Sequence, residues 1–384
     1  MSQPFAQAFG DESLSDTLLN RSEEMELNFG PQHPSTHGVL RLKLKVDGER
    51  ILDCYPIIGY LHRGTEKLFE LHPFFQNVPH TDRMDYVAAA TNNLAYVGAV
   101  EKLVGLVVPP RARYIRTILC ELQRISSHLL WLATHAIDIG AMTPFFYCFR
   151  ERELILDLFE QYCGARLTLN CMRPGGQPHD LPVGWTDKCR EFIDLFPSKV
   201  DEYEGLLTEN RIWKKRTVGV GVLDPETAID YAVSGPLLRG SGIKWDLRKE
   251  MPYEAYPEVE FDVPVGKNGD TYDRYLVRME EMRQANNIIR QCLEKLPEGP
   301  IMAKRPRVMK AAKDAEVYHA IEGPKGEIGF YIVGDGTPNP YRCHVRAPSF
   351  INLQVVPELA KGQLIADLVA IIGTTDIVLG EVDR

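Results

Sequence analysis

Hydrophobic and polar residues alternate strictly over residues 40–46, where three leucines and a valine occupy the even positions and basic residues the odd positions. A period of two is typical of a strand with one buried face. Asp47 and Gly48 follow directly, and an Asp-Gly pair favours a two-residue hairpin turn. The pattern therefore predicts a β-hairpin over residues 38–56.

In the middle of the chain, the hydrophobic pattern has a period of three to four residues. Apolar residues recur at these steps over residues 115–137, which is typical of a helix with a buried face. Similar patterns predict helices over residues 84–104, 151–171, 187–212 and 271–295. We therefore expect a helical bundle over residues 60–300.

Two further segments, residues 326–334 and 341–346, flank a stretch rich in Gly, Pro and Asn. They predict a second hairpin, which we expect to extend the first sheet. Together with the tail up to residue 384, these elements indicate one domain over residues 26–384. The acidic residues 1–25 predict a flexible arm. The fold class is α+β, mostly helical, with a small antiparallel β platform.

Composition narrows the possible functions. The chain of 384 residues is 44% hydrophobic and 25% charged, as in soluble globular proteins, and its net charge of −9 argues against a general nucleic-acid binder. No segment has the roughly 18 uninterrupted apolar residues of a membrane span, so we expect any membrane role to be peripheral. Eight cysteines without a CxxC pair indicate reduced thiols, mostly buried, in a cytosolic compartment.

The first candidate functional residues are His33 and His37, which lie in a loop rich in Pro and Gly, residues 28–38. Pro34 follows His33 and disfavours the helical conformation there, so a metal site on a helix is not indicated. Two imidazoles on a stiff loop suggest a functional site. A turn that enters a strand, with two surface histidines, fits the local sequence equally well.

Two further candidates flank predicted helices. Residues 80–86 resemble a helix start, in which Asp82 is a cap, Asp85 lies near the positive end of the dipole and Tyr86 falls in the first turns. A tyrosine there is usually a packing residue. Asp138 ends the helix of residues 115–137, where the dipole disfavours negative charge. It therefore needs a partner, which can be water, an arginine or an imidazole.

Several separate motifs then match one family in the right order. They are residues 28–38, 59–67, 82–86, 173–176 and 376–384. From about residue 26 to its end, the sequence closely resembles the D subunit of respiratory complex I, the NADH:quinone oxidoreductase. That family is related to the large subunit of [NiFe] hydrogenases. The resemblance implies a helical bundle like that of the hydrogenase large subunit.

The hydrogenase metal is held by two paired-cysteine motifs, and both are replaced here. Residues 83–88 (RMDYVA) stand where an RxCGxC pattern is expected, and residues 376–381 (DIVLGE) stand where a DPCxxC pattern is expected. Without these soft thiolate ligands we expect no nickel or iron, and we predict no metal ligand in this chain.

In the family, the vacated cavity holds the headgroup of a quinone. The resemblance implies that His37 and Tyr86 hydrogen-bond its two carbonyl oxygens, and that Asp138 pairs with His37 and keeps it protonated. A phenol and an imidazolium can each donate a proton to a quinone that receives two electrons. The residues expected to line the pocket are Thr134, Met84 and Val378. The type of quinone stays open.

The resemblance also places two arginines at an electron donor. Arg63 and Arg83 match family residues that face a [4Fe–4S] cluster bound by the neighbouring B subunit. Local sequence alone favours structural arginines paired with Asp82 or Glu66, and the motif context reverses that preference. FMN and further iron–sulfur clusters are expected elsewhere in the complex, so that this chain alone binds no cofactor and quinone is its substrate.

The resemblance further implies a hetero-oligomer. The expected partners are the B, C and I subunits and the membrane-embedded H subunit, in a proton-translocating enzyme. We expect the chain to lie peripherally, on the cytoplasmic side of the bacterial inner membrane. Two rivals remain: a metal-free scaffold that joins the peripheral and membrane arms, and an energy-converting hydrogenase subunit, which the missing cysteines disfavour.

One departure from the family pattern gives a prediction. Thr168 stands where many relatives have a histidine that couples the potential of the cluster to pH, and the nearest histidine along this segment is His179. We expect the midpoint potential of the cluster to be nearly independent of pH between about pH 6 and about pH 8, because the titrating imidazole is missing. A potentiometric titration checks this, and a steep slope contradicts it.

Overall fold

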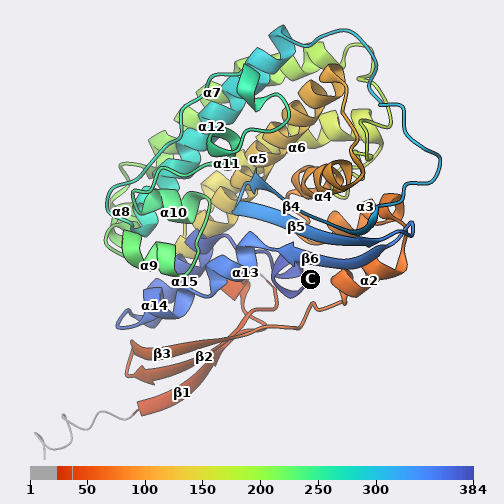
Figure 1. The fold of residues 1–384 in the computed structure, drawn as a ribbon. Helices are drawn as coiled ribbons and strands as arrows, with labels where there is room; N and C mark the ends of the chain where they lie inside the picture. The colour runs from red at the N-terminus through yellow and green to blue at the C-terminus, as the bar shows by residue number, and fades with distance from the viewer. Residues whose placement is uncertain (1–23, 37) are drawn as a thin grey trace, which may run out of the picture.

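A computed structural model describes residues 24–36 and 38–384 of the chain. This part is mostly helical and contains two separate three-stranded antiparallel sheets, which confirms the predicted α+β class. Figure 1 shows the first sheet projecting from one end of the molecule, whereas the second sheet lies against the helical bundle.

The first sheet consists of β1 (Glu24–Phe29), β2 (Arg41–Asp47) and β3 (Arg50–Ile57), in that order. β2 and β3 form the predicted hairpin, although its turn lies at Gly48 and Glu49, one residue later than predicted. β1 was not predicted and includes the last two residues of the expected arm, whose first 23 residues lie outside the described part. Its side chains are exposed except at Phe29, so the strand lacks the alternation of buried and exposed positions by which a strand is recognised in a sequence.

The second sheet consists of β4 (Lys313–Gly323), β5 (Gly326–Asp335) and β6 (Pro340–Arg346). β5 and β6 form the predicted second hairpin. The expectation that this hairpin extends the first sheet is wrong, because β5 pairs with β4 and β6. β4 was missed because its first half is largely exposed and its second half is buried at every position, so neither half alternates.

Long helices make up the bundle. They are α4 (Ala89–Val104), α5 (Pro110–Ile139), α6 (Thr143–Cys163), α7 (Trp185–Leu207) and α12 (Thr271–Glu294). The central α5 packs against α4, α6 and α12 and also against α15. The shorter helices are α2 (Thr65–Leu71), α3 (Val78–Thr81), α8 (Arg211–Thr217), α9 (Pro225–Asp230), α10 (Pro236–Gly240), α11 (Leu247–Glu250), α13 (Pro348–Leu353), α14 (Val356–Ala360), α15 (Ile365–Thr375) and α16 (Leu379–Asp383).

Several helix boundaries differ from the prediction, and both α5, at Pro110, and α6, at Thr143, begin earlier than predicted. Residues 84–88 form a turn, and α4 begins only at Ala89. α6 ends at Cys163, because Gly164 adopts the left-handed conformation that terminates helices. The helix predicted over residues 187–212 is divided, because the Asn210 side chain accepts hydrogen bonds from two backbone amides and so caps a new helix, α8.

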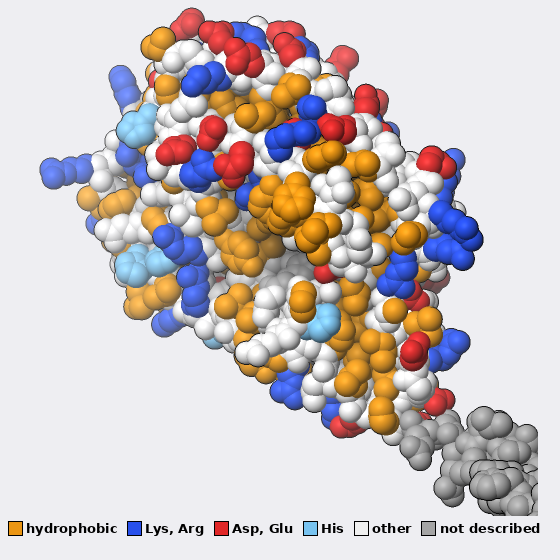
Figure 2. All heavy atoms as spheres, turned by 180° about the vertical axis from the view of Figure 1, so that it is seen from behind, with side chains coloured by type: hydrophobic (Ala, Val, Ile, Leu, Met, Phe, Trp, Pro, Cys, Tyr) orange, Lys and Arg blue, Asp and Glu red, His pale blue; other side chains and the backbone are white. Residues whose placement is uncertain are grey.

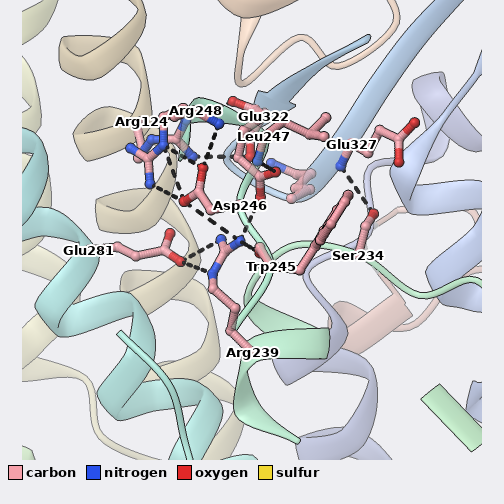
Figure 3. A network of polar contacts seen from close by, with 12 residues as sticks. Arg124, Ser234, Arg239, Trp245, Asp246, Leu247, Arg248, Glu281, Glu322 and Glu327 are labelled. Carbon is pink, nitrogen blue, oxygen red and sulfur yellow. Dashed lines mark hydrogen bonds and ion pairs between the residues drawn. The ribbon is translucent and has the colours of Figure 1, made fainter. Parts of the chain in front are cut away.

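Buried charged side chains join the helices to the second sheet (Figure 3). Arg239 on α10 pairs with Glu281 on α12 at 2.6 Å and with Glu322 on β4 at 2.7 Å, and all three are buried. Removing one member of a buried ion pair leaves an uncompensated charge, which costs about 3–5 kcal/mol. The network therefore fixes the position of β4 relative to the bundle.

The tip of the β4–β5 hairpin is held by the same region of the core. Arg124 on α5 donates to the backbone oxygens of Glu322 at 2.7 Å and Gly323 at 3.0 Å. Asn352 on α13 donates to the backbone oxygen of Lys325, within the turn, at 3.1 Å. The position of Lys325 is thereby set by contacts from two helices.

We expect Gly326→Ala to lower the thermal unfolding midpoint much more than Gly336→Ala, a matched change at the next hairpin turn. Both glycines have positive φ, 134° and 89°, so both substitutions incur a backbone strain of about 1 kcal/mol. A Cβ at Gly326 lies 2.4 Å from Oγ of Ser234, whereas the nearest atom to a Cβ at Gly336 lies at 3.9 Å. Equal losses of stability in the two variants contradict the tight fit of the hairpin tip.

Candidate functional site

A cavity of about 280 Å³ lies where α5 meets the turn before α4, the β4–β5 hairpin and the segment after α15. Four of the predicted site residues line it: Tyr86, Thr134, Asp138 and Val378. Thr134 and Asp138 are one helical turn apart on α5 and therefore share a face. Segments far apart in the sequence thus converge on one wall.

The other predicted residues lie elsewhere or are not described. Met84 is completely buried in the hydrophobic core and is not among the residues that line this cavity. His37 lies outside the described residues, so the geometry leaves its predicted role and its pairing with Asp138 untested.

Asp138 anchors the loop that enters the cavity from the N-terminal side. Oγ of Ser35 donates to Oδ1 of Asp138 at 3.0 Å. Thr36 is fixed in turn, because its hydroxyl donates to the backbone oxygens of Pro31 at 3.0 Å and His33 at 2.8 Å. Pro34 of this loop lines the cavity. The loop is therefore held against the carboxyl end of α5.

Tyr86 lies in the turn before α4 and not in the first turns of a helix, as was predicted. Its side chain is half-buried. Burial, together with the neighbouring Asp85 carboxylate, raises the pKa of the Tyr86 phenol. The phenol therefore stays protonated well above neutral pH and can act as a hydrogen-bond donor in the cavity.

The two aspartates predicted to support a helix start have other roles. Asp82 follows α3 and accepts hydrogen bonds from the backbone N–H of Asn170, at 3.1 and 3.2 Å, and from the Asn93 amide at 2.8 Å. Burial raises the pKa of Asp82 to about 6. Asp85 accepts from the N–H of Val87 at 3.1 Å, within the turn. Neither caps α4, whose N-cap residue is Ala88.

Lys325 was not predicted as a site residue, although it lines the cavity. It sits in the β4–β5 turn, a position that usually faces solvent, yet it is only 3% exposed. Its Nζ lies 3.2 Å from Oδ2 of Asp85 and 3.8 Å from Oδ2 of Asp376, and it donates to Oγ of Ser127 at 3.0 Å. No local sequence signal distinguished this turn from an exposed one.

Two stretches that the sequence analysis singled out, residues 83–88 and 376–381, are in direct contact. A Cβ on Gly380 would lie 2.6 Å from the backbone oxygen of Met84 and 3.3 Å from Cδ1 of Tyr86. The same two stretches contribute Tyr86 and Val378, among others, to the cavity wall. Among the residues that the structure describes, no group of three or more His, Cys, Asp and Glu could hold a metal ion.

Comparison with known proteins shows the family. The family described as "Respiratory-chain NADH dehydrogenase, 49 Kd subunit" matches residues 138–315 and 309–384. The chain is 55% identical to the D 2 subunit of the NADH-quinone oxidoreductase of Solibacter usitatus, over 97% of this chain and 100% of that one. It is 53% identical to the D subunits of the Geotalea uraniireducens and Geobacter sulfurreducens enzymes, each over 94% of this chain and 99% of the relative.

The chain belongs to the family of NADH-quinone oxidoreductase D subunits. This confirms the resemblance found in the sequence and makes the chain a subunit of an oxidoreductase complex. In the described part of this D-subunit chain, no helix is both long enough and apolar enough to cross a membrane.

The two predicted arginines of this family member are not among the residues that line the cavity. Arg63 and Arg83 are exposed, and both act on the pKa of His80, which burial lowers first and the two arginines lower further. Within the described residues, no ion pair joins either arginine to a carboxylate, and Glu66 pairs instead with Arg342 at 2.8 Å. Because its pKa is lowered, the His80 imidazole stays neutral above neutral pH and does not change its charge there.

We expect Ser35→Ala to loosen the loop at the end of α5. A hydrogen bond to a charged group contributes about 1.5–3 kcal/mol, so amide exchange at Thr36 and Leu40 should accelerate about tenfold or more. Hydrogen exchange followed by mass spectrometry of the assembled complex measures this. Ser198→Ala on α7 removes a serine that bonds only locally, to the Leu195 oxygen at 2.8 Å, and is the control. Unchanged protection in Ser35→Ala contradicts the anchoring role of this bond.

Proposed function

We propose that the cavity binds the headgroup of a quinone, and that this chain supports the two-electron, two-proton reduction of that quinone at an interface with the B subunit. The observation that carries the proposal is the position of Tyr86, a protonated phenol on the wall of the cavity that Thr134 and Asp138 of α5 also line. The names of the relatives, which are D subunits of NADH-quinone oxidoreductases, supply the substrate class.

The composition of the cavity wall supports a quinone ring. Most of the surface of the wall is apolar, and Leu130, Trp131 and Val378 contribute to it, whereas the polar groups belong to individual side chains set among the apolar ones. Pockets for small organic ligands are typically apolar, with a small number of polar groups that fix orientation. A flat ring with two carbonyl oxygens matches such a wall.

Reduction of a quinone requires proton donors that keep their protons until the quinone has received its electrons. A quinone carbonyl is a weak base, and it becomes a strong one as two electrons arrive. Tyr86, whose pKa is raised by burial, holds its proton until then and donates it to one carbonyl oxygen. We propose that His37 donates to the other and that Asp138 stabilises its charged form. The sum is quinone plus two electrons plus two protons, which gives quinol.

The electrons are supplied by other subunits. We propose that a [4Fe–4S] cluster on the B subunit delivers them, after NADH has reduced FMN and further iron–sulfur clusters elsewhere in the complex. Arg63 and Arg83 are exposed and have no carboxylate partner among the described residues, so their charge is available to favour the reduced, more negative cluster.

An apolar surface supports assembly with other subunits. Hydrophobic side chains gather around a hollow on the face shown in Figure 2, and charged side chains lie mostly toward its edges. Ile137 at the end of α5, which lines the cavity, is 37% exposed, and Met142 and Phe146 at the start of α6 are 63% and 60% exposed. Such patches mark interaction sites. We propose that the B, C, I and H subunits assemble around this chain, on the cytoplasmic side of the inner membrane.

We expect Tyr86→Phe to reduce the quinone reductase rate of the assembled complex by about 100-fold or more, because the phenylalanine cannot donate a proton. NADH oxidation by an artificial acceptor that bypasses the quinone site should be unchanged. Tyr272→Phe, which removes a half-buried hydroxyl bonded to the Thr208 oxygen, is the control. Full quinone reductase activity in Tyr86→Phe favours the metal-free scaffold.

A further inference from the structure

Asp376 is a buried acceptor on the cavity wall for which the proton transfers described above give no role. It is 6% exposed, and its Oδ2 accepts no hydrogen bond from the residues that the structure describes. Nζ of Lys325 is 3.8 Å from this atom, beyond hydrogen-bond distance, and lies closer to Asp85, at 3.2 Å, and to Ser127, at 3.0 Å. A buried polar atom without a partner is unfavourable, so the cavity wall offers an acceptor to a donor on a ligand.

The backbone at Asp376 is also in an uncommon conformation. Asp376 ends α15 at φ 55° and ψ 45°, in the left-handed region that residues other than glycine seldom adopt. The helix dipole, in addition, disfavours a negative charge at the carboxyl end of a helix. Two locally unfavourable features at one residue of a cavity wall indicate that this residue has a function in the cavity.

We propose that Asp376 recognises the reduced headgroup, by accepting a hydrogen bond that a quinol hydroxyl can donate and a quinone carbonyl cannot. This inference rests on the proposed function of the cavity. The two carbonyl oxygens of a quinone only accept hydrogen bonds, and so does a charged carboxylate. Reduction converts each carbonyl into a hydroxyl, which can donate. Oδ2 of Asp376 therefore makes no hydrogen bond with a carbonyl of the substrate and gains one with the product.

Nearby cations support Asp376 as a charged acceptor. The Lys325 ammonium supplies a counter-charge at 3.8 Å. The negative charge of Asp376 also reaches the buried Arg278 of α12, where it opposes the lowering of the guanidinium pKa by burial. Hydrogen bonds to a charged acceptor are about twice as strong as those between neutral groups. The carboxylate can therefore distinguish sharply between a headgroup that donates and one that does not.

Tyr86 and Asp376 favour different states of the headgroup. The Tyr86 phenol donates, so it can bind a carbonyl oxygen of the oxidised ring, whereas Asp376 contributes only once the headgroup carries a proton. A residue that binds the product more tightly than the substrate shifts the bound pair toward quinol by the ratio of the two affinities. The same preference slows the release of quinol, because the hydrogen bond must break before the product leaves.

The test compares the affinities for quinone and quinol in Asp376→Asn, within the assembled complex and without oxygen. The measured quantities are KM for a short-chain quinone and the inhibition constant Ki of the matching quinol. We expect the ratio of Ki to KM to rise by about tenfold, because a charged acceptor is replaced by a neutral one and the new amide N–H can donate to a carbonyl. Asparagine tolerates the left-handed conformation, so the backbone at this position is kept.

A second variant separates the lost acceptor from the added donor. Asp376→Gly also suits the left-handed backbone and removes the side chain altogether. We expect its Ki for quinol to rise about tenfold, as the acceptor is gone, while its KM for quinone does not fall, as no donor is added. An unchanged Ki in Asp376→Gly overturns the proposal.

Asp314→Asn is the matched control, because Asp314 also has a positive φ, 61°, yet is exposed on β4 and does not line the cavity. Oxidation of NADH by an artificial acceptor shows that each variant assembles. A ratio of Ki to KM in Asp376→Asn within about threefold of that in Asp314→Asn overturns the role of Asp376. Tyr86→Phe distinguishes this result from failure of the proposed function: full activity in Tyr86→Phe means that the cavity is not the quinone site, whereas its loss with an unchanged ratio in Asp376→Asn removes only the role of Asp376.

Discussion

The cavity depends on the compensation of one buried charge. The ammonium of Lys325 lies in the protein interior, where it is tolerated only because Asp85 and Asp376 lie beside it and Ser127 accepts its hydrogen bond. These partners come from the turn before α4, the segment after α15 and α5 itself. Moving either aspartate away removes part of the compensating charge, and moving α5 removes a hydrogen bond, so this cluster joins the segments on which the site is built.

A second buried network makes that arrangement possible. Arg239, Glu281 and Glu322 tie β4 to the helices, and Arg124 binds the backbone at the hairpin tip (Figure 3). The function of these residues is therefore indirect. They place the lysine, which lies on the cavity wall together with Asp376 and Asp138.

Much of the fold followed from periodicity, because elements such as α6, α7 and β2 bury one face and expose the other. The site was harder to predict from local pattern. Tyr86, Thr134, Asp138 and Val378 were found through the resemblance to a family, and the structure brings all four to one cavity. Lys325 was missed because a lysine in a two-residue turn usually faces water, and its burial is decided by contacts with residues far away in the sequence, such as Asp85. The same kind of distant contact explains why Asp82 was mistaken for a helix cap, since Asn170 is its partner.

The most direct test of the central claim is a structure of the assembled complex with a bound quinone analogue. We expect the ring to occupy the cavity, with one carbonyl oxygen within hydrogen-bond distance, about 2.6–3.2 Å, of the Tyr86 hydroxyl. Density for the ring at a site away from Tyr86, with the cavity closed or filled by protein, contradicts the claim.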